Sequence, residues 1–134
     1  MDMTDPRLAF PKPEPRRRTK GRKDRVERVV RQSVRAQCVE RDHDCRLGAW
    51  FWRDDFSVEV WGSECRGESE WAHLKGHRRS QTRGQAPEAR HTTTHSLMLC
   101  TRHHGMEERG RLIVTPLTPR GCDGPLRFEV KEGR

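Results

Sequence analysis

The sequence predicts an α+β fold in which an N-terminal helix and an inserted β-hairpin precede a strand–strand–helix unit. Three observations predict it. Apolar residues recur at helical spacing in the N-terminal quarter, short strand-like stretches follow, and cysteines and histidines with the spacing of metal ligands are spread over the rest of the chain. The last observation adds a structural metal site to the predicted fold.

The N-terminal segment divides into an arm and a helix. Residues 1–23 carry four prolines followed by RRRTKGRK, a composition too poor in apolar groups to fold. We therefore expect a disordered basic arm there and a folded domain over 24–134. Asp24 and Glu27 match a capping box, which predicts a helix from about 25 to 41. Its apolar stripe would comprise Val26, Val29, Val30, Val34 and Cys38.

The composition limits the size of the core. Of 134 residues, 31% are hydrophobic and 36% are charged, which predicts one domain with a thin core. The five cysteines could staple such a core as disulfides or as metal ligands. No apolar signal segment and no stretch of membrane-spanning length is present in the sequence. We therefore expect a cytoplasmic protein with reduced thiols, which favours metal ligation.

Basic residues outnumber acidic residues by 28 to 20, which gives a net charge of +8. Most of the excess lies between Arg16 and Arg35. This distribution favours a polyanionic partner, with nucleic acid as the first expectation. A merely solvated tail is the alternative.

Short strands and turns occupy most of the remaining chain. A β-hairpin is predicted over Trp50 to Trp61, where the polar turn RDDF separates AWFW from SVEVW. A long polar loop from Lys75 to Thr94 separates two further strand patterns, EWAHL and THSLML, and loops of this length are often functional. A short helix ended by Gly110 is predicted in CTRHHGMEERG. Two closing strands, RLIVTP and LRFEV, flank the turn RGCDGP.

Three of these segments together resemble the HNH nuclease motif, namely CRGESEWAHL, THSLML and CTRHHGMEERG. The resemblance extends from Arg41 to about Val114 and is greatest to the compact HNH proteins of bacteriophages, whose pattern is a cysteine, then AH, a long loop, and LCxxHH. It implies the ββα-metal fold of that family. It also implies a metal-dependent endonuclease that hydrolyses DNA phosphodiester bonds, by nicking or double-strand cleavage, in the bacterial or phage-infected host cytoplasm.

The resemblance implies a role for three residues in particular. His73 would be the general base, because a neutral imidazole can take a proton from water near neutral pH. His104 would hold a catalytic divalent cation such as Mg²⁺, Mn²⁺, Ni²⁺ or Zn²⁺. Glu108 lies four residues later on the same helical face and could complete that site.

Two positions depart from the usual motif. His95 stands where the motif has Asn, and it would either ligate the catalytic cation or hydrogen-bond the loop. Ala72 stands where many relatives have a metal ligand. Glu70 is a weaker ligand candidate, because strand alternation places it on the opposite face from His73. These departures make a zinc-stapled DNA-binding or interaction module with weakened catalysis the alternative function.

A separate structural zinc site is implied by the same resemblance. Cys100 and His103 form a C-x-x-H knuckle, and the upstream pair would be Cys45 and Cys65, which together give a closed Cys₃His site. Zinc binding would supply folding free energy that the small core lacks. The two remaining cysteines, either of which could replace an upstream ligand, are Cys38 and Cys122.

Arginines near the predicted active site would bind DNA phosphates, which positions a duplex without reading its sequence. They belong to the arm, the first helix and the loop HRRSQTRG: Arg16, Arg17, Arg18, Arg28, Arg31, Arg35, Arg78, Arg79 and Arg83. The expected partner is DNA, bound by a monomer. A phage terminase large subunit is a second partner implied by the resemblance alone. An RNA-directed HNH toxin is a third possibility that the residues leave open.

Overall fold

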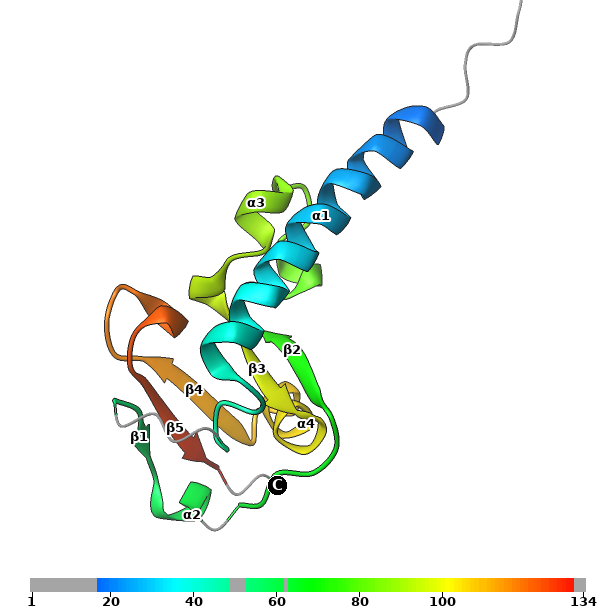
Figure 1. Cartoon of the computed structure of the whole chain (residues 1–134). Coiled ribbons are helices and arrows are strands. Elements are labelled where there is room, and N and C mark those ends of the chain that lie inside the picture. Colours follow the sequence, from blue (N-terminus) through cyan, green and yellow to red (C-terminus); the bar gives the residue numbers. More distant parts are fainter. Residues whose placement is uncertain (1–16, 49–52, 62, 132–134) are drawn as a thin grey trace, which may run out of the picture.

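The computed structural model describes residues 17–48, 53–61 and 63–131. It is a mixed α and β fold in which a long helix leaves the body of the domain at one end (Figure 1). None of the described helices has the length and apolar character needed to cross a membrane. The elements are α1 (Arg17–Asp42), β1 (Asp55–Phe56), α2 (Val58–Trp61), β2 (Ser69–His73), η2 (Arg79–Gln81), α3 (Pro87–Arg90), η3 (Thr93–His95), β3 (Ser96–Cys100), α4 (Thr101–Glu108), β4 (Leu112–Pro116), η4 (Gly121–Asp123) and β5 (Leu126–Val130).

Two small sheets form the body of the domain. In one, β2 and β3 are antiparallel, with His73 opposite Ser96 and Ser69 opposite Cys100, and α4 follows β3 directly. In the other, the strand order is β1-β5-β4. The strand predictions for EWAHL, THSLML, RLIVTP and LRFEV are confirmed, as is the helix before Gly110. The buried apolar side chains of both sheets form one core cluster, which includes Leu97, Leu99, Leu112, Leu126 and Phe128.

The β-hairpin predicted over Trp50 to Trp61 is wrong for the part that the structure describes. β1 pairs in parallel with β5, and Val58–Trp61 forms one helical turn. Phe56 stacks on Phe128 with ring centroids 5.3 Å apart, and the Ser57 amide donates to the Phe128 carbonyl. Phe56 therefore packs against the C-terminal strand, and Trp61 packs edge-on against Phe56 with ring centroids 5.5 Å apart. Residues 49–52 lie outside the described part of the chain.

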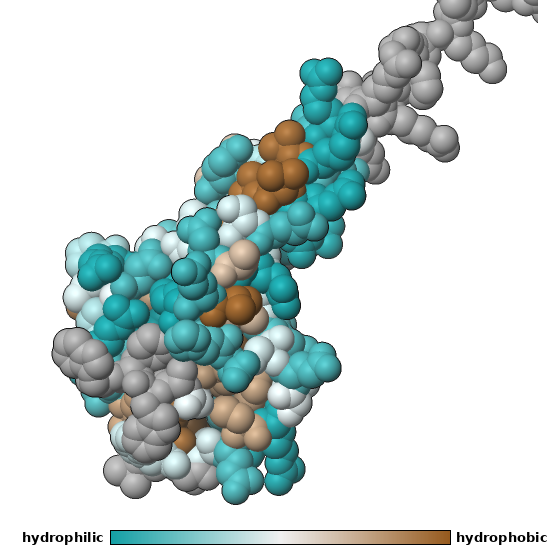
Figure 2. Space-filling view, in the orientation of Figure 1, coloured by the Kyte–Doolittle hydropathy of each residue, from teal (hydrophilic) through white to brown (hydrophobic). Residues whose placement is uncertain are grey.

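The predicted start of the first helix at about residue 25 is also wrong, because α1 begins at Arg17. The division into an arm over 1–23 and a domain over 24–134 stays a prediction. Lysine and arginine favour helix, so the basic run continues the helix without a cap at Asp24. Only the C-terminal part of the apolar stripe is buried: Val26 is 45% exposed and Val29 is 65% exposed. Figure 2 shows apolar side chains at the surface of α1. Residues 1–16 lie outside the described residues.

A buried arginine joins α1 to both sheets. Arg46 is fully buried, and its guanidinium donates to the carboxylates of Asp42 and Asp54 and to the carbonyls of Cys122 and Gly124. Asp42 also accepts a hydrogen bond from the Met98 amide of β3. Because each charge in this network has a partner, the network fixes the end of α1 against the rest of the domain.

Removing Asp54 should destabilise the domain strongly. We expect Asp54→Ala to lower the free energy of unfolding by about 3–5 kcal/mol, because the buried Arg46 guanidinium loses both hydrogen bonds to Asp54 and keeps Asp42 as its carboxylate partner. The neighbouring Asp55 is the matched control: its side chain is 59% exposed and pairs with Arg127 at the surface. Asp55→Ala should cost less than about 1 kcal/mol. Urea denaturation of the two zinc-loaded variants measures the difference, and equal losses would contradict the prediction.

Candidate metal centre and histidine pocket

Three cysteines and one histidine meet beside the first turn of α4. The Sγ atoms of Cys45, Cys65 and Cys100 and a ring nitrogen of His103 all lie within 4.8 Å of one another. Cys45 follows α1, Cys65 precedes β2, Cys100 ends β3, and His103 lies in α4. The prediction that these four residues come together is confirmed, and the group could hold a structural metal ion such as zinc.

The distances fit tetrahedral zinc. With Zn–S bonds of about 2.3 Å and Zn–N bonds of about 2.05 Å, tetrahedral angles require S···N separations of about 3.5 Å. The Nδ1 atom of His103 lies 3.5 Å from Cys45 Sγ, 3.7 Å from Cys65 Sγ and 3.2 Å from Cys100 Sγ. The donor set of three thiols and one imidazole is also one that zinc prefers over harder cations.

The surroundings of the cluster support metal binding. The other ring nitrogen of His103, Nε2, lies 2.9 Å from the Ser63 hydroxyl, the kind of contact that orients a ligating imidazole. Burial raises the pKa of the Cys45 thiol to about 12, so a thiolate at that position requires a bound cation. Gly67 has a φ of 82°, and a Cβ there would lie 2.6 Å from Thr101. The loop that carries Cys65 can therefore approach α4 this closely only with glycine at that position.

The two other cysteines do not belong to the cluster. Cys122 is fully buried in η4, and Cys38 is fully buried on α1, where its Sγ lies 3.4 Å from Ser96 Oγ. Among the described residues, neither replaces Cys45 or Cys65. The burial of Cys38 agrees with its predicted place in the apolar stripe of the first helix.

His73 ends β2 at the mouth of a surface pocket. Burial, together with the nearby His91 and Arg31, lowers the pKa of His73 to about 4. The ring is therefore neutral at pH 7 and able to accept a proton. Its Nε2 atom lies 3.1 Å from Nδ1 of His91, and Trp71 packs against it with ring centroids 4.4 Å apart.

His104 lies between two carboxylates. Its Nδ1 atom is 2.9 Å from Oε1 of Glu70, and its Nε2 atom is 3.3 Å from Oε1 of Glu108. Glu70 does lie opposite His73 on the strand, as alternation requires, but α4 covers that face and brings His104 to it. If Glu70 accepts from Nδ1, Nε2 is left free to ligate a cation with Glu108. A separation of about 3 Å is normal for neighbouring ligands of octahedral Mg²⁺.

His73 and His104 line the same pocket, of about 460 Å³. Glu108 lines it as well, and the loop after β2 contributes basic side chains to its wall. The pocket therefore combines a neutral imidazole, a possible cation site and positive charge. Its other lining residues are Trp71, Arg78, Arg79, Ser80 and Arg83.

His95 is not brought together with His104. Its ring stacks on His77 with centroids 3.6 Å apart, and its Nδ1 atom lies 2.8 Å from the Thr92 hydroxyl. It lines a different pocket, beside Leu112. The hydrogen bond to Thr92 is within the loop, so the placement agrees with the loop-bonding role and not with cation ligation. Among the described residues, no group of three or more ligands other than the cysteine cluster is close enough to hold a metal.

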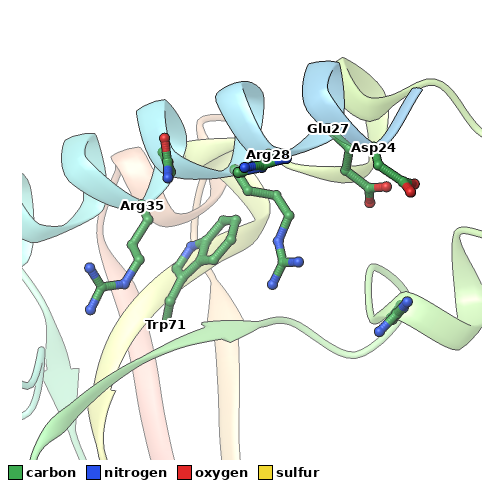
Figure 3. Close-up of a pocket in the computed structure, with 8 residues that line it drawn as sticks. Asp24, Glu27, Arg28, Arg35 and Trp71 are labelled. Atoms are coloured by element: carbon green, nitrogen blue, oxygen red, sulfur yellow. The ribbon is translucent and has the colours of Figure 1, made fainter. Parts of the chain in front are cut away.

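Basic side chains of α1 form a groove next to this pocket. Arg28, Arg31 and Arg35 line a cavity of about 510 Å³ together with Trp71 and Arg79, which also line the histidine pocket. Figure 3 shows Trp71 on β2 facing α1, the helix that carries Arg28 and Arg35. Arg16 lies outside the described residues, and the side chains of Arg17 and Arg18 are not described.

Two contact residues were not identifiable from the local sequence pattern: His91 and Glu27. Glu70 is predicted from the sequence as a weaker ligand candidate, and the structure places it beside His104. His91 had no signal because it lies in the polar loop, and Glu27 matched a capping position. The alternation of β2 is the one signal that separates Glu70 from His73 and puts it on the side that α4 covers.

Comparison with protein-family models gives no match, and comparisons with curated proteins and with solved structures give none either. Functional assignment therefore depends on the residues of the two sites.

Proposed function

We propose that the chain is a metal-dependent endonuclease of the HNH type that hydrolyses DNA phosphodiester bonds. The observation that carries this proposal is the single pocket lined by His73, His104 and Glu108, with arginines on its wall. A phosphodiester in that pocket would meet a proton acceptor, ligands for a cation and positive charge together. These are the groups that phosphodiester hydrolysis requires.

His73 acts as the general base in this proposal. Its neutral ring takes a proton from a water molecule, the water oxygen bonds to phosphorus, and the bond from phosphorus to the leaving sugar oxygen breaks. The leaving oxygen takes its proton from solvent, and His73 later returns its own proton to solvent. A divalent cation held by His104 and Glu108 would neutralise charge on the phosphate. Glu70 fixes the ring of His104.

The basic groove along α1 and the loop after β2 bind the DNA backbone. Arg79 belongs to both the groove and the histidine pocket, so a phosphate chain could run from one to the other. Arg79 and Arg83 are exposed, whereas Arg78 is held by the buried carboxylate of Glu107 at 2.7 Å. Binding by such contacts weakens steeply as salt concentration rises. A role beside a phage terminase in the host cytoplasm follows from the resemblance to phage HNH proteins alone.

A zinc-stapled DNA-binding module without catalysis is the second candidate. Ala72 is 1% exposed and supplies no ligand, and His95 lies in another pocket. These placements leave His104 and Glu108 as the two ligands of the proposed cation, with the substrate phosphate and water supplying the rest. A module of this kind would bind DNA through the same arginines and leave the duplex intact.

Nicking of supercoiled plasmid distinguishes the two candidates. With Mg²⁺, Mn²⁺ or Ni²⁺ the wild type should nick the plasmid, and His73→Ala should lower the rate by about 100- to 10,000-fold. The matched control is His43→Asn, because His43 is exposed with a φ of 64°, a conformation that asparagine tolerates. Equal rates for wild type and His73→Ala, or DNA binding without cleavage, would overturn the nuclease proposal. A structured RNA in parallel tests the choice of nucleic acid.

A further inference from the structure

His73 is hydrogen-bonded to a second histidine, His91, which in turn is hydrogen-bonded to Glu27. Nε2 of His73 lies 3.1 Å from Nδ1 of His91, and Nε2 of His91 lies 3.1 Å from Oε1 of Glu27. The three side chains come from separate parts of the fold: β2, the residue after α3, and α1. They form a continuous hydrogen-bonded chain that runs from α1 to the mouth of the histidine pocket.

The chemistry of the three groups gives this chain a direction. A carboxylate only accepts hydrogen bonds, so Nε2 of His91 is the donor to Glu27. When both rings are neutral, Nδ1 of His91 then carries a lone pair and accepts from Nε2 of His73. His73 is left with an unprotonated Nδ1. The carboxylate on α1 therefore determines which nitrogen of His73 is free to take a proton.

The local packing holds the chain in this arrangement. His91 is 7% exposed, and the ring of Trp71 packs against both histidines, with centroids 4.4 Å from His73 and 5.5 Å from His91. Arg90 donates to the same oxygen of Glu27 at 3.0 Å. The hydrogen bond from His91 lowers the pKa of Glu27, and Arg90 lowers it further against the opposing effect of burial, so the carboxylate is ionised at neutral pH.

We propose that Glu27 and His91 are positioning residues that hold His73 in the tautomer with a proton on Nε2 and a basic Nδ1. This inference rests on the proposed endonuclease function for its effect on rate, although the tautomer itself does not depend on it. When His73 takes the proton of the attacking water on Nδ1, its Nε2–H continues to donate to His91. This hydrogen bond keeps the His73 ring in one orientation while the imidazolium forms.

Nitrogen-15 NMR of the zinc-loaded full chain, labelled on histidine, tests the tautomer directly. Protonated and unprotonated ring nitrogens give separate resonances, and His73→Gln and His91→Gln identify the signals of each ring. At pH 7.5 we expect both rings to carry their proton on Nε2. A proton on Nδ1 of His73, or a His73 ring that exchanges between the two tautomers, would overturn the proposal.

Plasmid nicking by variants of Glu27 tests the effect on rate. Glu27→Ala should lower kcat by about 10- to 100-fold, the usual cost of losing an outer-shell partner. The KM for DNA should not rise, because Glu27 lines the basic groove and its loss removes a negative charge from there. Glu27→Gln keeps an oxygen that accepts from His91 and should restore most of the rate. Glu40→Ala, which removes an exposed carboxylate from the same helix, is the control. A wild-type rate for Glu27→Ala would overturn the positioning role.

The NMR and nicking experiments distinguish an error in the proposed endonuclease function from an error in the positioning proposal. If the wild type does not cleave DNA but both rings are protonated on Nε2, the endonuclease function is wrong and the hydrogen-bonded chain stands. If the wild type cleaves DNA while His73 carries its proton on Nδ1, the function stands and the positioning proposal is wrong.

Discussion

Loss of the metal is expected to unfold the domain. The cluster joins the end of α1, the loop before β2, the end of β3 and the start of α4, which the thin apolar core alone holds weakly. Structural zinc contributes about 10–16 kcal/mol of apparent binding free energy at pH 7, comparable to the whole stability of a domain this size. A strong chelator should therefore abolish the cooperative thermal transition, and adding Zn²⁺ should restore it.

Substitution of single zinc ligands tests whether this cluster is the metal site that stabilises the fold. Cys100→Ala should reduce the zinc content from about one ion per chain to none and remove the thermal transition. Cys38→Ala is the matched control, since Cys38 is equally buried but lies outside the cluster. It should keep its zinc and melt as one transition. Metal analysis and calorimetry of the two variants measure the difference, and full zinc retention in Cys100→Ala would show that the cluster is not the metal site.

Part of the metal cluster could be predicted because two of its ligands lie close together in the sequence, at a spacing typical of zinc sites. Cys100 and His103 lie one helical turn apart, so an α4 beginning at Thr101 presents both to one ion. Cys45 and Cys65 are harder to choose, because the four cysteines other than Cys100 compete for two places. Only the three-dimensional fold distinguishes the ligands from the other cysteines. Cys122 and Cys38 are buried elsewhere, whereas the close approach of the loop at Gly67 to α4 brings Cys65 to the cluster.

The positioning residues of His73 could not be predicted because their contacts are distant in sequence. Glu27 and His91 are 64 residues apart and meet where α1 and the loop after α3 pass beside β2. No local sequence pattern predicts that these segments lie side by side.

The inserted β-hairpin was predicted wrongly for the same reason. Phe56 is paired with Phe128, far along the chain, and two strand-like patterns in a sequence do not say which strands pair with each other.

Replacing His104 is expected to separate catalysis from the metal-stabilised fold. His103 and His104 are adjacent, but His103 faces the cysteines and His104 faces Glu70 and Glu108. His104→Ala should lower plasmid nicking by about 100- to 10,000-fold, because several kcal/mol of charge stabilisation is lost and each 1.4 kcal/mol is a factor of ten. Its zinc content and melting temperature should stay near wild type, since the side chain is 20% exposed and is not one of the four residues of the cluster.

Substitution of the adjacent histidine should give the opposite result. His103→Ala removes a zinc ligand, so the variant should lose the thermal transition, and its loss of nicking would follow from unfolding.

Glu70→Gln leaves His104 in place and should lower nicking by about 10- to 100-fold, because only the contact that orients the His104 ring is weakened. If His104→Ala lost zinc, or nicked plasmid at the wild-type rate with Mg²⁺, Mn²⁺ and Ni²⁺, His104 could not hold the catalytic cation, and the proposed division of the two histidines would be wrong.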